Sequence, residues 1–383
     1  MRLDDVRVLD LTRLLPGPYA SQLLADMGAD VVKVEEPEIG DYARMTSDEE
    51  TGIFQAVNRG KRSVTLDLKA DAGREAFLEL AAAADVILEG FRPEVMGRLG
   101  LDYESVREHN PGIVYCSLSG FGATGPNRDR VGHDLNYIGM AGLLDMTRPD
   151  ADAAPVIPGY PIADMAGGLF AAFGVLGGLL SRELGDGTGE HVDVAMTDVI
   201  VSFSQAVAGE AIAGEDPRPG ETTLTGELPC YDAYETADGR YVTLAALEPQ
   251  FFEAFCGAVD RPDLADEHMA EDPAVRATLR EELAAIFRER TREEWETFLA
   301  DVDAMVAPVR TPGEVVESEQ VEARGLLDES AAGRRIGFPA VPSGGLPEGP
   351  GSVPGLGEHT DEVLEEYGVS ADAIEALRAA EAT

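Results

Sequence analysis

The first half of the chain alternates short, β-branched segments with segments of helical periodicity, and this alternation constrains the fold more than any other feature. Between the predicted strands, Pro18–Met27 and Ala72–Ala83 carry apolar residues at helical spacing. Strands separated by helices of this length favour βαβ units and a parallel sheet that helices cover on both faces. We therefore predict an α/β fold with a doubly wound parallel sheet. The segments predicted to be strands are Val6–Leu11, Asp30–Glu35, Ser63–Leu68, Asp85–Leu88 and Val114–Leu118.

Stretches rich in turn-forming residues divide the rest of the 383-residue chain. One stretch, rich in Pro, Gly and Glu, predicts a linker near the middle of the sequence. Farther on, Asp238-Gly239 is a hairpin signal between two strand-like runs, and helical segments follow it. The predicted order is a large domain of residues 1–213, a linker of residues 214–226, a smaller α+β domain of residues 227–312, and a second linker with the C-terminal segment, residues 313–383.

Acidic residues dominate the charge of the chain, because 72 Asp and Glu stand against 30 Lys and Arg, a net charge of -42. The lysines are Lys33, Lys61 and Lys69. Such a charge repels itself in dilute buffer and is tolerated where salt shortens the Debye length to roughly 3 Å at 1 M. We interpret the composition as adaptation to a salt-rich cytoplasm, with an ordinary acidic protein as the alternative. It argues against a broad surface for nucleic acid or for an anionic membrane.

The cysteines Cys116, Cys230 and Cys256 are scattered, without a paired or metal-ligand spacing. We therefore predict neither a disulfide framework nor a structural metal site. No basic-then-apolar signal pattern precedes the first predicted strand. The most apolar stretch, Met165–Leu180, is short for a membrane span and rich in Gly and Ala, so we predict a buried helix there. The expected location is cytoplasmic.

Residue types alone leave the role of three candidate side chains open. Asp164 precedes a helix of small residues, where free backbone N–H groups favour negative charge, so its carboxylate could act as a base or nucleophile. An N-cap is the plain alternative for Asp164. His133 lies in a loop-like step, and a lone histidine is more often a surface or satisfied core residue. Glu248 precedes Pro249 at a predicted helix start, a position that also suits a solvated glutamate.

Eight short motifs nevertheless occur in a specific order. Together they resemble the class III CoA-transferase family (CaiB/BaiF type), which also contains the α-methylacyl-CoA racemases. Each motif is weak by itself, but the ordered set is specific and covers nearly the whole chain. The motifs are Pro16–Ala20, Leu24–Glu35, Asn58–Ser63, Asp67–Lys69, Phe91–Pro93, Ser119–Gly122, Gly132–Tyr137 and Ala163–Gly168.

The resemblance implies an architecture that the local patterns do not reveal. Members of the family form interlocked homodimers, in which the returning C-terminal segment completes the large domain. The active site then lies between the large domain of one subunit and the small domain of the other. We accordingly expect a homodimer.

The resemblance also assigns chemistry. Asp164 falls on the catalytic aspartate of both branches, His133 on the catalytic histidine of the racemase branch, and Glu248 on a glutamate that orients this histidine. Racemisation next to a thioester needs one base on each face of the α-carbon, which a carboxylate and a neutral histidine can provide. We expect backbone donors near Asp164 to polarise the thioester carbonyl. The first hypothesis is racemisation of a 2-methyl-branched acyl-CoA, whose tail we expect to lie against Met140 and Met165.

Two alternatives remain. In a CoA-transferase, Asp164 would attack the donor thioester and pass CoA to an acceptor carboxylate through covalent intermediates. In a binding protein without catalysis, the pair of bases would have no use.

Coenzyme A is expected as part of the substrate, with no permanently bound cofactor and no metal. Its phosphates call for arginine or lysine. Lys61 and Arg62 are plausible neighbours of the site. Glu36 is a departure, because some racemases carry a CoA-binding arginine there, so this contact could be lost or could be supplied by Arg44. The positions that match CoA-contacting residues of the family are Leu66, Asp67, Leu68, Lys69, Arg92, Gly132, Asp134, Leu135, Asn136 and Tyr137.

Overall fold

The computed structural model describes residues 2–46, 52–150, 152–330, 333–347 and 351–383, so five residues of the predicted C-terminal segment lie outside the described part. The chain divides into two compact units. The larger contains Met1–Leu143, Pro158–Phe203 and Glu319–Thr383, and the smaller contains Leu144–Ile157 and Ser204–Ser318. Residues 144–157 and 204–213, which were predicted to lie in the large domain, therefore belong to the smaller unit.

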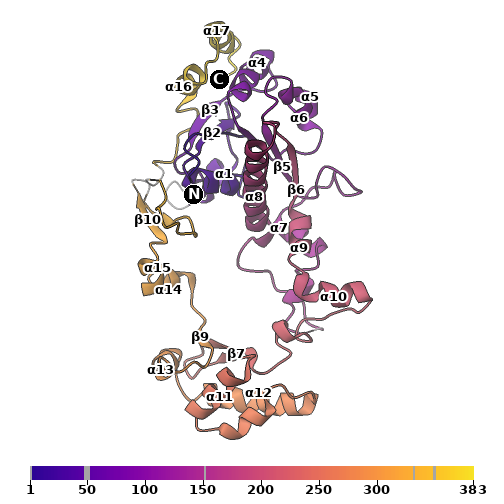
Figure 1. Ribbon diagram of the computed structural model, residues 1–383, viewed down its shortest axis with the longest axis vertical. Helices are drawn as coiled ribbons and strands as arrows, with labels where there is room; N and C mark the ends of the chain where they lie inside the picture. The colour runs from indigo at the N-terminus through magenta and orange to yellow at the C-terminus, as the bar shows by residue number, and fades with distance from the viewer. Residues whose placement is uncertain (1, 47–51, 151, 331–332, 348–350) are drawn as a thin grey trace. The chain divides into compact units, whose positions relative to one another are not determined.

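A six-stranded sheet forms the centre of the larger unit, with every pair of neighbouring strands parallel (Figure 1). The strand order is β3-β2-β1-β4-β5-β6, so the chain moves outward from β1 in one direction and then from β4 in the other. This order confirms the predicted doubly wound fold and places its switch point between β1 and β4. The strands are β1 (Arg7–Asp10), β2 (Asp30–Glu35), β3 (Arg62–Thr65), β4 (Val86–Glu89), β5 (Val114–Ser119) and β6 (His191–Ala195).

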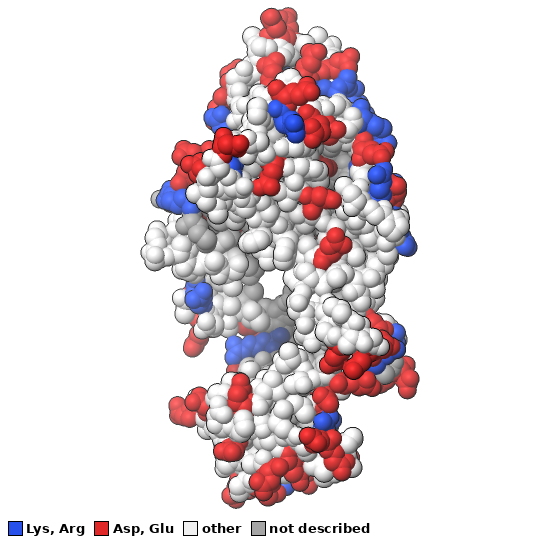
Figure 2. Space-filling view, turned by 45° about the vertical axis from the view of Figure 1, so that its right-hand side comes forward, with Lys and Arg blue, Asp and Glu red and all other residues white. Residues whose placement is uncertain are grey.

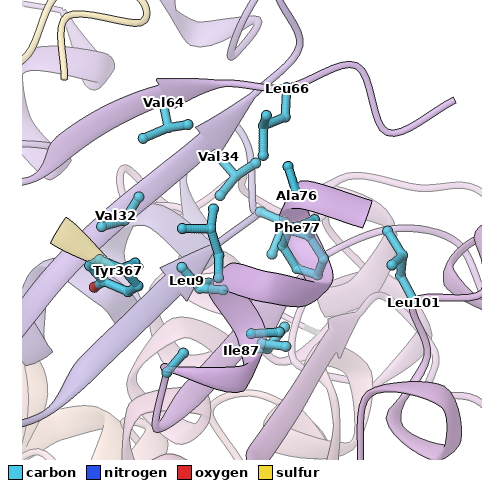
Figure 3. Packing of buried hydrophobic residues seen from close by; sticks show 14 of the residues in the cluster. Leu9, Val32, Val34, Val64, Leu66, Ala76, Phe77, Ile87, Leu101 and Tyr367 are labelled. Atoms are coloured by element: carbon cyan, nitrogen blue, oxygen red, sulfur yellow. The ribbon is translucent and has the colours of Figure 1, made fainter. Parts of the chain in front are cut away.

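Helices cover both faces of this sheet. On one face, α1 (Pro16–Asp26) and α8 (Ile162–Leu184) pack together and against the strands. On the other face lie α4 (Asp71–Ala82), α5 (Val95–Leu99) and α6 (Tyr103–Arg107), whose apolar side chains join those of Leu9 and its strand neighbours in one buried cluster (Figure 3). Because side chains alternate along a strand, Asp10 points to the opposite face from Leu9, toward α1.

The C-terminal segment returns to the larger unit, as the family resemblance implied. Its helices α16 (Thr360–Glu366) and α17 (Ala371–Ala379) contribute Val363, Leu364 and Leu377 to the same buried cluster. Hydrogen bonds fix this segment along β3 and beyond it: Thr65 N–H donates to Thr360 Oγ1 at 3.1 Å, and Asp67 N–H donates to the Ala382 carbonyl at 2.8 Å.

The smaller unit is an α+β domain with its own aromatic core. Its antiparallel sheet has the order β7-β8-β9, and the predicted hairpin turn at Asp238-Gly239 joins β7 to β8. Phe252, Phe255, Phe287 and Trp295 pack in its core. Its main elements are β7 (Tyr231–Glu235), β8 (Tyr241–Ala245), β9 (Val306–Pro308), α11 (Pro249–Ala258), α12 (Pro273–Phe287) and α13 (Arg292–Phe298).

Shorter elements complete the chain. A two-stranded antiparallel ribbon pairs β10 (Leu327–Ser330) with β11 (Gly333–Ile336). The remaining helices are α2 (Ala43–Thr46), α3 (Ile53–Val57), α7 (Asp134–Met140), α9 (Met196–Ser202), α10 (Gln205–Ala213), α14 (Pro312–Val316) and α15 (Glu319–Ala323), with 3₁₀ turns at Asp145–Thr147, Thr223–Thr225 and Pro262–Glu267.

Helix α8 is longer than the apolar stretch from which it was predicted. By length and composition it could cross a membrane, but 50% of its most apolar window is buried in the protein, and buried core helices meet the same criteria. Leu169, Phe173 and Leu180 on this helix are exposed. The prediction of a buried helix therefore holds for half of that window. Elsewhere the surface carries the acidic side chains expected from the composition, which Figure 2 shows scattered over the visible face.

Candidate active site

Two cavities open at the switch point of the sheet, where ligands of doubly wound folds bind. We call the first the Asp164 cavity. It has a volume of about 340 Å³, and its lining includes Arg13, Phe91, Arg92, His133 and Asp164. Arg13 follows β1 and Phe91 follows β4, so both come from the carboxyl ends of the two strands that flank the switch point. The cavity lies wholly within the larger unit.

Asp164 is the third residue of α8, and another carboxylate caps the start of that helix. Asp134 Oδ1 accepts hydrogen bonds from Ala163 N–H at 2.6 Å and from Asp164 N–H at 3.1 Å. Asp164 is therefore not the N-cap, and the plain structural alternative for it is wrong. These two N–H groups donate to Asp134, and the expectation that backbone donors near Asp164 polarise a thioester stays a prediction.

The environment of Asp164 raises its pKa to about 6. Burial is the main cause, because it disfavours the charged form, and the nearby Asp134 carboxylate adds to the effect. His133 opposes both by favouring the carboxylate. A carboxyl group with this pKa can gain and lose a proton near neutral pH, which an ordinary aspartate does poorly.

Hydrogen bonds within one loop hold His133 beside this carboxyl group. His133 has extended backbone immediately before α7, and its N–H donates to Asn136 Oδ1 at 3.1 Å. The Tyr137 hydroxyl donates to the Gly132 carbonyl at 2.5 Å. These two hydrogen bonds lie within the segment from Gly132 to Tyr137 and hold the backbone of His133 at the wall of the cavity.

Glycines let these elements approach closely. A Cβ atom on Gly168 would lie 2.3 Å from the carbonyl oxygen of Pro16, and one on Gly120 would lie 2.4 Å from Cε1 of Tyr137. Contacts this short are impossible for a larger residue without movement of the backbone or ring. Two of the ordered motifs therefore contain glycine because the first turn of α1 and the ring of Tyr137 pack directly against them.

We call the second cavity the Lys69 cavity. Its volume is about 360 Å³, and Leu66, Asp67, Leu68 and Lys69 line it together with Glu36. The two cavities share three lining residues, Thr12, Arg13 and Phe91. They therefore meet at the loops after β1 and β4.

The structure brings many of the predicted residues to these cavities. Arg92, Gly132, His133, Tyr137 and Asp164 line the Asp164 cavity, and the segment from Leu66 to Lys69 lines the other. Three predicted contact residues line neither cavity. Asp134 caps α8, Asn136 holds the backbone of His133, and Leu135 is exposed.

Lys61 and Arg62, predicted as neighbours of the site, are engaged elsewhere. The Lys61 ammonium is fully buried, 3.1 Å from Asp10 Oδ2 and 2.7 Å from Ser21 Oγ, so it has no access to a ligand. Arg62 pairs with Asp30 and Glu366 at 2.5 Å each. Neither residue lines the Asp164 cavity or the Lys69 cavity.

The structure separates Glu36 from Arg44, the residue that could replace its expected contact. Glu36 lines the Lys69 cavity, but Arg44 does not, because its guanidinium forms an ion pair with Glu35 at 2.6 Å. Three arginines that line the Asp164 cavity were not among the predicted residues: Arg13, Arg128 and Arg130. The position of Arg13, two residues after the first predicted strand, was a usable signal for it.

Glu248 lies in the smaller unit, at the residue before the first turn of α11, with Pro249 as the first helical residue. Its role toward His133 stays a prediction. Within the described residues, no group of three His, Cys, Asp or Glu side chains could hold a metal ion.

Comparisons with known proteins agree with this geometry. The family description "CoA-transferase family III" matches residues 3–360. A succinyl-CoA:mesaconate CoA-transferase of Haloarcula marismortui is 39% identical over 390 aligned residues, which cover 96% of each chain. The alpha-methylacyl-CoA racemase of Homo sapiens is 34% identical, over 98% of this chain and 95% of its own. The crystal structure of a CAIB/BAIF family protein from Brucella suis has a TM-score of 0.81 at 31% identity, over 95% of this chain and 98% of its own. The chain therefore belongs to CoA-transferase family III.

Proposed function

We propose that this enzyme racemises C2 of 2-methyl-branched acyl-CoA thioesters. Its family acts on acyl-CoA thioesters, and what carries the finer proposal is the presence of His133 and Asp164 in one cavity. Racemisation passes through a planar enolate, so one group must remove the α-proton and another must return a proton to the opposite face. A transferase needs the carboxylate but has no need for a second base.

In this mechanism, Asp164 and His133 exchange roles between the two epimers. For one epimer, the Asp164 carboxylate takes the proton from C2, and the electron pair of the C–H bond moves into the thioester enolate. A protonated His133 then gives its proton to C2 from the other face. For the other epimer the steps run in reverse. A pKa of about 6 for Asp164 suits this exchange, because both protonation states are accessible near neutral pH.

The two cavities together support binding of the CoA thioester. With the thioester in the Asp164 cavity, the nucleotide end would lie in the Lys69 cavity. Arg92 and Arg130 line the Asp164 cavity and have no acidic partner among the described residues. They would bind negative groups of the substrate. CoA is then a carrier on the substrate, not a resident cofactor.

One observation favours a second candidate, a CoA-transferase. The relative from Haloarcula marismortui carries that name at 39% identity, against 34% for the human racemase. Asp164 would then attack the donor thioester, release CoA as a thiolate and form a mixed anhydride. CoA thiolate would attack the aspartyl carbonyl of the anhydride, giving an aspartyl-CoA thioester and releasing the donor acid. An acceptor carboxylate would attack this thioester, forming a second anhydride and CoA thiolate, and the thiolate would then attack the acceptor acyl carbon to give the new acyl-CoA and return the Asp164 carboxylate.

One experiment distinguishes the racemase from the CoA-transferase. The protein is incubated in D₂O at high KCl with a (2S)-2-methylacyl-CoA, once alone and once with succinate. Deuterium at C2 together with the 2R epimer, without succinate, is the expected result. His133→Ala should slow this exchange by about 10²–10⁴-fold, and the exposed His109→Ala should leave it unchanged. Succinyl-CoA formed only with succinate, with no exchange in either sample, would overturn the racemase proposal.

A further inference from the structure

Arg13 lies at the junction of the two cavities and lines both of them. Its guanidinium carbon is 4.8 Å from the ring centroid of Tyr42 and 5.1 Å from that of Phe91. Such cation–π contacts hold a guanidinium in place without neutralising its charge. Among the residues that the structure describes, Arg13 has no ion pair or side-chain hydrogen bond with an acidic residue.

The acidic residues near Arg13 already have other partners. Glu35 pairs with Arg44 at 2.6 Å, and Asp41 pairs with Lys33 at 2.9 Å. Glu36 Oε2 accepts the Ile39 N–H at 2.9 Å. The charge of Arg13 is therefore available to a ligand, although acidic side chains line the same cavity. Arg7 and Arg98 also lack an acidic partner among the described residues, but neither lines these cavities. In a chain with a net charge of -42, an unpaired arginine at the junction of two cavities is a candidate for binding an anionic ligand.

We propose that Arg13 binds the diphosphate of the acyl-CoA and supplies the cation that the chain lacks at Glu36. The diphosphate connects the nucleotide of CoA to its pantetheine arm. With these two halves in the two cavities, the diphosphate passes the junction where Arg13 lies. The planar guanidinium fork can bind phosphate oxygens through two parallel hydrogen bonds. This inference rests on the proposed acyl-CoA substrate, but not on the choice between racemase and transferase.

Calorimetric titration of three ligands at one fixed KCl concentration tests the proposal. CoA carries the diphosphate and a 3′-phosphate, 3′-dephospho-CoA keeps only the diphosphate, and pantetheine has neither. Arg13→Gln should weaken CoA and 3′-dephospho-CoA alike by about 10- to 100-fold, since it removes charge-assisted hydrogen bonds, and should leave pantetheine within about twofold. The surface variant Arg107→Gln, whose side chain pairs with Glu104 away from both cavities, should bind all three like the wild type.

Three outcomes would overturn the proposal. If only the affinity for CoA falls, Arg13 binds the 3′-phosphate and not the diphosphate. If the affinity for pantetheine falls equally, the role of Arg13 is structural. If no affinity changes, Arg13 does not bind the ligand. Glu36→Arg gives an independent check, because it should restore at least part of the CoA affinity of Arg13→Gln; no recovery would contradict a shared phosphate site. The racemase proposal can fail independently of this one. It fails if Arg13→Gln weakens CoA binding as expected but the wild-type enzyme exchanges no deuterium at C2.

Discussion

Lys33 and Lys61 lie close to the same turn as Arg13, yet the two kinds of positive side chain have opposite surroundings. Both lysines are fully buried, and each contacts a carboxylate: Lys33 with Asp41 at 2.9 Å and Lys61 with Asp10 at 3.1 Å. The Lys33 ammonium also donates to the carbonyl of Thr12, the residue before Arg13. The buried contacts of these two lysines stabilise the turn after β1, and neither ammonium group is accessible to a ligand.

Three of the four arginines that line the Asp164 cavity show the reverse pattern, and the fourth, Arg128, pairs with Glu94. Arg13, Arg92 and Arg130 line a solvent-accessible cavity, and none has an acidic partner among the described residues. In a chain this acidic, most arginines elsewhere find a carboxylate. The comparison teaches that, among the positive side chains around these two cavities, those without an acidic partner are the candidates for binding a ligand, whereas those with one are already engaged by the protein.

The largest effect expected from this comparison is on stability. Lys61→Met should lower the free energy of unfolding by about 3–5 kcal/mol, because it leaves the buried Asp10 carboxylate without its closest cation. Burial alone would raise the pKa of Asp10, and Lys61 and Lys33 together hold it well below its usual range. Chemical denaturation at fixed KCl measures the change. Lys69→Met, at the rim of the other cavity, is the matched control and should change stability by less than about 0.5 kcal/mol.

A double variant sharpens the result. Asp10→Asn with Lys61→Met should be more stable than Lys61→Met alone, since the uncompensated charge has been removed. If Lys61→Met is no less stable than the wild type, the ion pair does not brace the turn and the comparison fails.

Much of the fold could be predicted because strands of a parallel sheet carry their own signal. The run Asp30–Glu35 coincides with β2, and Val114–Leu118 lies on β5. The run Ser63–Leu68 was too long, because β3 ends at Thr65. Leu66 is buried in the core although it lies beyond the strand. An apolar residue in the sequence indicates burial, and here both the strand and the residue after it are buried. The hydrophobic pattern therefore could not show where the strand ends.

The candidate site was predictable where the ordered motifs matched the family and not where distant partners decide the outcome. Lys61 is buried because Asp10, 51 positions earlier, lies opposite it. The N-terminus of α8 is capped by Asp134, which is 29 positions before Ala163. No local pattern reports such pairings. The same limit explains why residues 144–157 were grouped with the wrong unit, because a segment's neighbours in sequence do not determine its neighbours in space.

Asp164 contrasts with Asp10, because no buried lysine offsets its burial, and this difference predicts a pH-dependent stability. An unfolded aspartate titrates near pH 3.9, whereas Asp164 in the folded protein titrates near 6. The stability that this carboxyl contributes is therefore complete below about pH 4 and is lost as pH rises through about 6. Asp164→Asn cannot ionise and escapes this loss.

Relative to the wild type, Asp164→Asn should gain about 1–2 kcal/mol of unfolding free energy between about pH 4 and pH 8, after allowance for the partial exposure of the side chain. Unfolding curves at several pH values measure this gain, with the exposed Asp5→Asn as the control that should show none. A gain of the same size at every pH would mean that Asp164 has no raised pKa.

The smallest effect tests the other side of the comparison. Arg92→Gln and Arg130→Gln should each change the free energy of unfolding by less than about 0.5 kcal/mol, because neither guanidinium has an acidic partner to lose. Arg59→Gln is the contrast, since Arg59 pairs with Asp26 at 2.7 Å and both side chains are almost fully buried; its loss should cost about 3 kcal/mol or more. If the cavity variants lose as much stability as Arg59→Gln, these arginines support the fold, and their lack of a partner carries no information about a ligand.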